Sequence, residues 1–251
     1  MPKLIKKIKR FIGKIIVNIR NPMVVDEHFA PKDGLELSDY IETRNVTAVH
    51  SILRYRWAVC VLEEIPQKGK ILDLACGSGF GSFMLAKAFP QSLVVGSDYD
   101  PKAIQYAQKN YSAPNLRFVV GDGTRWEQTV GAEIYDVITS FDTLEHVRHR
   151  DIFMENLVSH LQPLGCLLFS TPCGTSVNEL LPVWSHHHIE YSSASLYDFI
   201  QRYFGQVIRP EDEVFPCREV FAVLQGTGVN YNLTMNPILC KQPVVFANPY
   251  K

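Results

Sequence analysis

The sequence predicts an α/β fold built on a doubly wound, mostly parallel seven-stranded sheet, and three observations carry this prediction. Short apolar runs alternate with amphipathic segments of helical length, a pattern typical of βαβ units. The first run leads into a glycine-rich turn, and two apolar runs in the tail predict an antiparallel hairpin that completes the sheet. The strands are expected at 70–75, 93–98, 116–120, 134–140 and 164–170, with the hairpin at 207–208 and 237–240.

The helices are predicted from the spacing of apolar residues and from signals at the helix ends. The pattern becomes helical from Thr47 to Ile65 and is ended by Pro66 and Gly69. Asp100 and Pro101 have the residue types of an N-cap and a first helical position. Further helices are expected at 79–89, 101–110, 145–161 and 193–203.

Charge is distributed unevenly along the chain, which we divide into a basic amphipathic helix over 1–20, an irregular connector over 21–45 and one domain over 46–251. Residues 1–20 hold seven of the 25 basic residues and no acidic residue. The remainder carries 18 basic and 26 acidic side chains, a formal charge of −8. A general nucleic-acid binder needs a basic face on its folded domain, so we expect no nucleic-acid partner.

The large apolar residues of 1–20, except Val17, fall within an arc of about 140° on a helical wheel. This pattern favours either a helix in an anionic membrane interface or a stripe that docks on the domain or on a second subunit. No apolar run approaches the ~18 residues of a membrane span. The six cysteines are scattered without a C-x-x-C pair, which indicates reduced, cytoplasmic cysteine usage and no disulfide framework. We therefore expect a cytoplasmic protein, peripheral at the inner membrane face if the helix binds lipid.

The glycine-rich turn after the first strand predicts a ligand site. Gly77, Gly79 and Gly81 have the spacing G-x-G-x-G. Glycines let the backbone approach a ligand closely and adopt positive φ. The second strand ends in Asp98, where a carboxylate can accept hydrogen bonds from both hydroxyls of a ribose. The third strand leads to Gly121-Asp122-Gly123, where an acid can take an adenine amino group.

Five motifs occur in order over about residues 70–205: D-x-A-C-G-x-G-x-G, G-x-D, G-D-G, Y-D-V-I-x-S-F-x-T-x-E-H-V and L-x-P-x-G-x-L-x-x-S-T-P. Together they resemble the class I S-adenosylmethionine-dependent methyltransferase family. Within it, the chain is similar to the bacterial branch associated with surface-polysaccharide and natural-product methylation, through Arg54-Tyr55 before the first strand and His-x-Glu after the fifth. The resemblance implies a Rossmann-like methyltransferase fold.

The resemblance also implies S-adenosyl-L-methionine as cofactor and a set of residues that bind it. Arg54 and Tyr55 are candidates for the methionine carboxylate, with surface residues on a packing helix as the alternative. Asp73 is expected to fix the glycine turn through backbone amides. The complete expected set is Arg54, Tyr55, Asp73 and Ala75, then Gly77 and Gly79 at the methionine moiety, Asp98 at the ribose, Asp122 and Gly123 at the adenine, and Tyr99 and Phe141 packed on the cofactor.

Methyl transfer from a sulfonium is an in-line displacement, so catalysis depends mainly on the position of the acceptor, and a hydroxyl acceptor also benefits from a base. His188, oriented by Glu190, is the first candidate for this base. His146 is the second candidate, or else a structural residue at the start of a helix. We expect no metal, because consecutive histidines cannot all face one ion and no cysteine or carboxylate pattern supports zinc.

Several functions remain open from the sequence. The first is O-methylation of a glycan or small-molecule hydroxyl near the membrane. The second is methylation of a lipid or quinone head group, which the basic helix would also suit. A scaffold protein that binds the cofactor without chemistry is disfavoured by the intact Gly77, Gly79 and Asp98. An NAD oxidoreductase is disfavoured by the glycine spacing.

Overall fold

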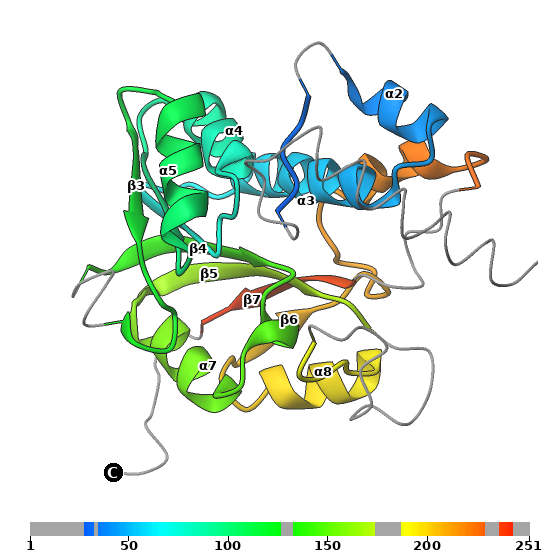
Figure 1. Cartoon of the computed structure of the whole chain (residues 1–251). Coiled ribbons are helices and arrows are strands. Elements are labelled where there is room, and N and C mark those ends of the chain that lie inside the picture. Colours follow the sequence, from blue (N-terminus) through cyan, green and yellow to red (C-terminus); the bar gives the residue numbers. More distant parts are fainter. Residues whose placement is uncertain (1–27, 33–34, 127–132, 174–186, 229–235, 243–251) are drawn as a thin grey trace, which may run out of the picture.

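A seven-stranded sheet runs through the centre of the computed structural model, which describes residues 28–32, 35–126, 133–173, 187–228 and 236–242 (Figure 1). The strand order is β3-β2-β1-β4-β5-β7-β6. The first five strands are parallel, and β7 is antiparallel to both of its neighbours. The predicted doubly wound, seven-stranded fold is therefore confirmed. The strands are β1 (Lys70–Leu74), β2 (Leu93–Asp98), β3 (Leu116–Val120), β4 (Tyr135–Phe141), β5 (Leu161–Thr171), β6 (Gln206–Ile208) and β7 (Asn236–Lys241).

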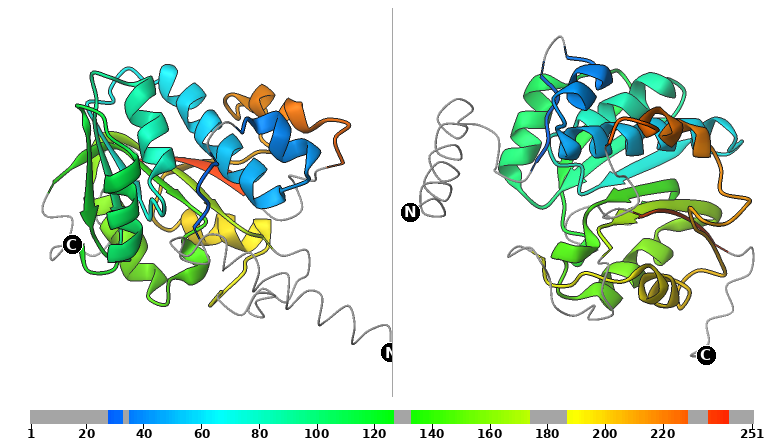
Figure 2. Two further views of the ribbon diagram at one scale, coloured as in Figure 1. Left: turned by 45° about the horizontal axis from the view of Figure 1, so that its top comes forward. Right: turned by 90° about the vertical axis from the view of Figure 1, so that its right-hand side faces the viewer.

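Helices cover both faces of the sheet (Figures 1 and 2). One layer holds α3 (Val46–Glu63), α4 (Phe80–Ala88) and α5 (Pro101–Asn110), and the other holds α7 (Arg150–Ser159) and α8 (Ser193–Ile200). Each layer packs on the sheet through its own apolar core. Because both faces are covered, the central strands are buried along most of their length, as in β1, where four of five residues are buried.

Local sequence signals fix several element ends. The Asp100 side chain accepts a hydrogen bond from the Lys102 amide at 2.9 Å, and Pro101 takes the first turn of α5, as predicted. The short helix α2 (Leu37–Glu42) lies in the segment expected to be irregular. A capping box between Glu36 and Asp39 and the burial of Leu37 and Tyr40 stabilise α2, which is too short to give a periodic signal.

The helix predicted over 145–161 is divided into two pieces. A 3₁₀ helix, η1 (Leu144–His146), is followed by an extended residue, Val147, and α7 begins only at Arg150. The buried Glu145 side chain accepts a hydrogen bond from Thr171 Oγ1 at 2.7 Å. This contact holds the first turn against β5, so the chain has to turn again before it can start α7.

The tail joins α3 through a disulfide bond, which the sequence analysis did not expect. Between β6 and β7, the 3₁₀ helix η2 (Arg218–Leu224) packs beside α3. Trp57 of α3 stacks on Phe215, with ring centroids 5.4 Å apart. This packing brings Cys60 and Cys217 together, with a Cα–Cα distance of 6.1 Å, and they form the bond. The expectation of reduced cysteines throughout is wrong for this pair, because nothing in the local sequence shows that the tail returns to α3.

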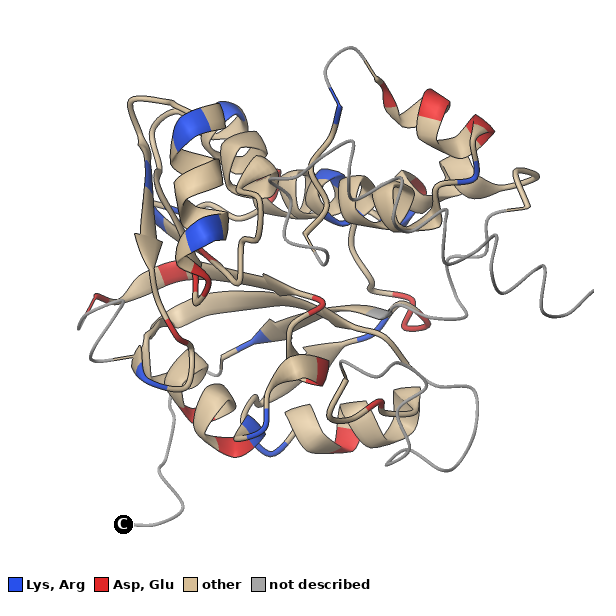
Figure 3. Ribbon diagram, viewed as in Figure 1, with Lys and Arg blue, Asp and Glu red and all other residues tan. Residues whose placement is uncertain are grey.

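The basic segment 1–20 lies outside the described residues, so its predicted helix and contacts remain predictions. None of the helices in the described part of the chain is both long and apolar enough to cross a membrane. Charges of both signs are present on the described elements, with acidic residues on α2 and α7 and basic ones on α5 (Figure 3).

Reduction of the disulfide is expected to lower the free energy of unfolding by about 2–4 kcal/mol, because the bond closes a long loop in the unfolded chain. Urea unfolding with and without dithiothreitol measures the difference, and Cys217→Ser should behave as the reduced protein does. Cys173→Ser, at a cysteine outside the bond, is the control. Equal unfolding midpoints in the two buffers would contradict the bond.

Candidate cofactor and acceptor site

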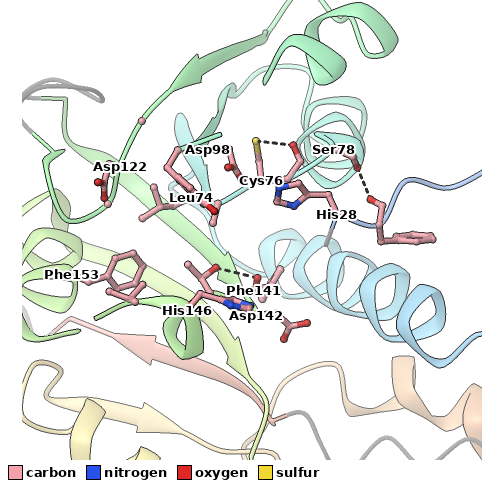
Figure 4. A pocket seen from close by; sticks show the side chains of 18 of the residues that line it. His28, Leu74, Cys76, Ser78, Asp98, Asp122, Phe141, Asp142, His146 and Phe153 are labelled. Atoms are coloured by element: carbon pink, nitrogen blue, oxygen red, sulfur yellow. Dashed lines mark hydrogen bonds between the residues drawn. The ribbon is translucent and has the colours of Figure 1, made fainter. Parts of the chain in front are cut away.

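A cavity of about 590 Å³ opens at the carboxyl ends of β1, β2 and β4 (Figure 4). The strand order reverses here, since β2 and β3 continue on one side of β1 and β4 and β5 on the other. Open α/β sheets bind ligands at this point. The residues after β1, β2, β3 and β4 all contribute to its wall, and so does α3.

The turn after β1 needs glycine at two positions for different reasons. Gly77 has φ +54°, and a Cβ there would lie 2.8 Å from His28 Nδ1, which packs on the turn. Gly79 has φ +85°, and its Cβ position is filled by Ala107 and Phe118 on the side of α5 and β3. Gly77 lines the cavity, whereas Gly79 shapes the start of α4.

Asp98, at the end of β2, is buried and held rigidly on the cavity wall. Its Oδ2 accepts a hydrogen bond from the Gly77 amide at 2.9 Å, and its Oδ1 accepts one from the Asp100 amide at 2.9 Å. A carboxylate oxygen has two lone pairs, so each oxygen can accept one further bond. The backbone contacts thus orient the carboxylate and leave a lone pair on each oxygen for a ligand.

Asp73 lies behind the cavity and is fully buried. It accepts hydrogen bonds from Ser82 Oγ at 2.6 Å, Thr139 Oγ1 at 2.8 Å and Tyr55 Oη at 3.0 Å. Burial raises the pKa of Asp73 to about 6, although the three hydroxyl donors act in the opposite direction. Its partners are hydroxyl groups of α3, α4 and β4, not the backbone amides that the sequence suggested. Asp73 therefore anchors the two helices to the sheet.

Arg54 and Tyr55 are both buried in the cavity wall, so the alternative of surface residues is wrong. The Tyr55 ring lies over Gly81, where a Cβ would come within 1.9 Å of its Cζ. Arg54 Nη1 lies 2.6 Å from Asp142 Oδ2. The Nε and Nη2 groups of Arg54 have no hydrogen-bond partner among the residues that the structure describes. A guanidinium can hold a carboxylate through two parallel N–H groups, so these two groups are the candidate donors to a ligand carboxylate.

The loop after β3 forms another part of the wall. Asp122 Oδ1 accepts hydrogen bonds from the Thr124 amide at 2.8 Å and from its hydroxyl at 2.7 Å. The Asn156 side chain donates to the Gly123 carbonyl at 2.8 Å, and a Cβ on Gly123 would lie 2.5 Å from Phe153. These contacts fix a narrow loop with an acid at its tip. In Figure 4, Asp122 and Phe153 lie at the end of the cavity away from His28.

Imidazole and guanidinium groups gather at the outer part of the cavity, on the loops after β4 and β5. Arg148 Nε donates a hydrogen bond to His188 Nε2 at 3.2 Å. Glu190 Oε1 lies 2.5 Å from Nδ1 of His187. The expectation that Glu190 orients His188 is therefore wrong. His187 and His188 are neighbours in a non-helical segment, so their side chains point in different directions, and His188 takes the exposed side.

Among the acidic residues near this rim, Glu145 has the most strongly shifted pKa. It is 1% exposed, and burial together with the nearby Asp142 carboxylate raises the pKa of Glu145 to about 8. Its backbone carbonyl accepts a hydrogen bond from the His188 amide at 2.6 Å, which joins the loops after β4 and β5. Asp142 itself has φ +50°, an unusual value for a residue with a side chain.

A family model described as a methyltransferase domain matches residues 65–209, more than half of the chain. The chain belongs to the class I S-adenosylmethionine-dependent methyltransferases. The malonyl-[acyl-carrier protein] O-methyltransferase of Bacillus cereus is 35% identical over 102 residues, which are 41% of this chain and 37% of that protein. The trans-aconitate 2-methyltransferase of Delftia acidovorans is 25% identical over 69% of this chain and 62% of that protein. The chain thus spans less than two thirds of these relatives.

Solved structures agree with the fold of this methyltransferase domain. The plantazolicin methyltransferase BpumL in complex with SAH covers 92% of this chain and 98% of its own, with a TM-score of 0.56 and 17% identity. An O-methyltransferase of a trans-AT PKS multienzyme of Brevibacillus brevis, in complex with S-adenosyl-L-homocysteine, covers 87% and 84%, with a TM-score of 0.57 and 15% identity. At these identities the likeness establishes the fold alone.

S-adenosylmethionine is the cofactor of this domain, and the cavity fits it. The unsatisfied donors of Arg54 match the methionine carboxylate, and the oriented Asp98 carboxylate matches a ribose. The individual roles remain predictions. Three of the expected residues, Asp73, Gly79 and Glu190, do not line the cavity that the described residues form. The other expected residues line it: Arg54, Tyr55, Ala75, Gly77, Asp98, Tyr99, Asp122, Gly123, Phe141, His146 and His188.

Several lining residues had no signal in the sequence. His28 and Phe29, in the expected connector, cross the glycine turn, where the Phe29 carbonyl accepts a hydrogen bond from Ser78 Oγ at 2.6 Å. Arg148 and His149 border the acceptor end and fell within the helix predicted over 145–161. The charge of Arg148 and the imidazole of His149, a few residues after the predicted strand over 134–140, were the available signals.

Arg54→Lys is expected to weaken S-adenosylmethionine binding by roughly 10–100-fold, since it removes the planar fork that can hold a carboxylate and each charged hydrogen bond contributes about 1.5–3 kcal/mol. Calorimetry measures the dissociation constant. The control ligand is 5′-methylthioadenosine, which has no carboxylate and should bind the variant and the parent protein equally. An equal loss for both ligands would mean that Arg54 supports the fold of the pocket and not the carboxylate.

Proposed function

We propose that this chain methylates an oxygen atom of a small molecule or a glycan. S-adenosylmethionine supplies an electrophilic methyl group when it is bound. The observation that carries the proposal is the continuity of one cavity, from Arg54, Asp98 and Asp122 to a rim of hydrogen-bonding groups on the loops after β4 and β5. A methyl group held between these two ends can meet an acceptor in line, which is the main requirement of the reaction.

The rim supports an acceptor rich in oxygen. His146, His149 and His188 line it together with the Arg148 guanidinium, and all of these can donate hydrogen bonds to hydroxyl or carboxylate oxygens. Relatives named for malonyl-[acyl-carrier protein] and trans-aconitate are in keeping with an acceptor that carries carbonyl or acid groups. An acidic sugar or a small hydroxy acid has both groups that the proposal needs. Its acid group would pair with Arg148, and its hydroxyl oxygen would accept the methyl group.

His188 is the proposed base, with His146 as the second candidate. In the described structure the lone pair of His188 Nε2 is engaged by a hydrogen bond from Arg148 Nε. An acidic group on the acceptor that pairs with Arg148 would release this lone pair. The base would then become available only when an acceptor of the right charge is present.

A lipid or quinone head group is a second candidate acceptor. It is favoured by relatives named as a phthiotriol/phenolphthiotriol dimycocerosates methyltransferase of Mycobacterium leprae and a ubiquinone biosynthesis O-methyltransferase of Schizosaccharomyces pombe. The basic helix proposed for residues 1–20 would place the enzyme at the inner membrane face in either case. Docking of that helix on a second subunit, in a homo-oligomer, is the alternative.

His188→Ala is expected to lower kcat by roughly 10²–10⁴ if this imidazole is the base, while Arg148→Gln should mainly raise KM for an acidic acceptor. The assay follows the transfer of labelled methyl groups to nucleotide sugars, small hydroxy acids, glycans and lipids, with products identified by mass spectrometry. If His146→Ala is the crippling variant and His188→Ala is mild, the assignment of His188 as the base is wrong. If no acceptor with a reactive oxygen is methylated, the proposal fails.

The full-length protein is expected to sediment with anionic vesicles and to be released by salt, since each cation near such a surface contributes about 1 kcal/mol. A variant that lacks residues 1–22 should remain in the supernatant and keep its cofactor affinity. Neutral vesicles are the matched control. Loss of an oligomer in the shortened variant, with no vesicle binding by the full-length protein, would instead show that the segment docks on protein.

A further inference from the structure

Three ligand-type side chains from two loops converge beside the acceptor end of the cavity. Glu145 and His146 belong to η1, and His187 belongs to the segment after β5. One oxygen or nitrogen atom from each lies within 4.8 Å of the other two. Glu145 Oε1 is 3.8 Å from His146 Nε2, and the rings of His146 and His187 meet edge to face with centroids 5.0 Å apart.

We propose that Glu145, His146 and His187 bind a divalent transition-metal ion of the zinc class, and that an oxygen of the methyl acceptor completes its coordination. Two imidazoles and one carboxylate are a known catalytic zinc set, which leaves a position open. Bonds of about 2.0–2.2 Å place donor atoms within about 4 Å of one another. A movement of each donor atom by less than about 1 Å would therefore bring all three to bonding distance from one ion. Only the identity of the oxygen ligand rests on the proposed function.

The groups around the cluster orient its donor atoms. Glu190, itself buried, lies 2.5 Å from Nδ1 of His187 and so leaves Nε2 for the ion. Thr171 Oγ1 donates to Oε2 of Glu145 at 2.7 Å, and Oε1 is the oxygen that faces His146. Carboxylates that hold the second nitrogen of a ligating histidine are a recurrent feature of metal sites, because they fix its tautomer and orientation.

Charge and position both favour a cation here. The Glu145 carboxylate is 1% exposed, and a buried carboxylate is unfavourable unless its charge is compensated. His146 is shared between the cluster and the cavity wall, so the open side of the site faces the acceptor. A metal ion there would bind the acceptor oxygen and make its proton easier to remove.

The other possible ligand group within the described part of the chain is Cys60, Cys217 and Glu219. The two sulfurs are joined in the disulfide and are not thiolates, so this group does not compete in the oxidised protein.

The test uses the full-length protein without an affinity tag, freed of metal and kept oxidised, and titrates it with Zn²⁺ against a chromophoric chelator. The expected result is one site per chain. His187→Ala and Glu145→Gln should each weaken binding at least 100-fold, while Glu190→Gln should weaken it roughly 10-fold as an orienting group. His149→Ala, at a histidine that lines the same cavity outside the cluster, is the matched control and should bind Zn²⁺ as the parent does.

Absence of saturable Zn²⁺ binding at tens of micromolar, or equal affinity in His187→Ala and His149→Ala, overturns the proposal. Affinity for S-adenosylhomocysteine and the thermal midpoint establish that each variant is folded. Because binding is measured without an acceptor, the result does not depend on the substrate. If the protein binds no Zn²⁺ and its rate of methyl transfer is unchanged by chelators, the proposed function stands and the metal site alone is overturned.

Discussion

The buried carboxylate of Asp73 is the point on which the cofactor half of the site depends. It receives hydroxyl groups from Tyr55 on α3, Ser82 on α4 and Thr139 on β4. A buried acceptor that loses a donor leaves an unsatisfied charge, so the three contacts fix both helices relative to the sheet. With Tyr55 held in this way, the preceding residue, Arg54, is brought to the cavity wall. The position of the unsatisfied guanidinium thus follows from a hydrogen-bond cluster behind the cavity.

Most of the fold could be predicted from the sequence because its signals are local. Strands covered on both faces are continuous apolar runs, and a parallel sheet puts their polar C-terminal residues at one edge. The glycine turn was equally visible, since the positive φ of Gly77 favours that residue type. Asp98 was found for the same reason, as a single acid at the end of an apolar strand. The capping pair Asp100 and Pro101 needed only adjacent residues.

Contacts between residues that are distant in sequence were harder to predict, both in the acceptor half of the site and elsewhere in the fold. Arg54 pairs with Asp142, and Cys60 with Cys217, and neither pair has a local pattern. The choice of His187 over His188 as the partner of Glu190 depends on side-chain direction in an irregular segment. The expectation of no metal rested on the adjacent histidines and on the lack of a cysteine or carboxylate pattern. The proposed metal site depends instead on η1, which places Glu145 and His146 beside a histidine from another loop.

The ring of Tyr55 occupies the space that a side chain at position 81 would need, and this has a consequence for how the protein can be divided. The family match begins at residue 65, but the cavity is completed by α3 and by residues 28 and 29. A fragment that starts at residue 65 would keep all seven strands, yet it would leave an open groove over Gly81 and remove a donor from Asp73. Chimeras that exchange the acceptor loops with a relative should therefore join upstream of α3, because the unit that alignment recognises is smaller than the unit that binds.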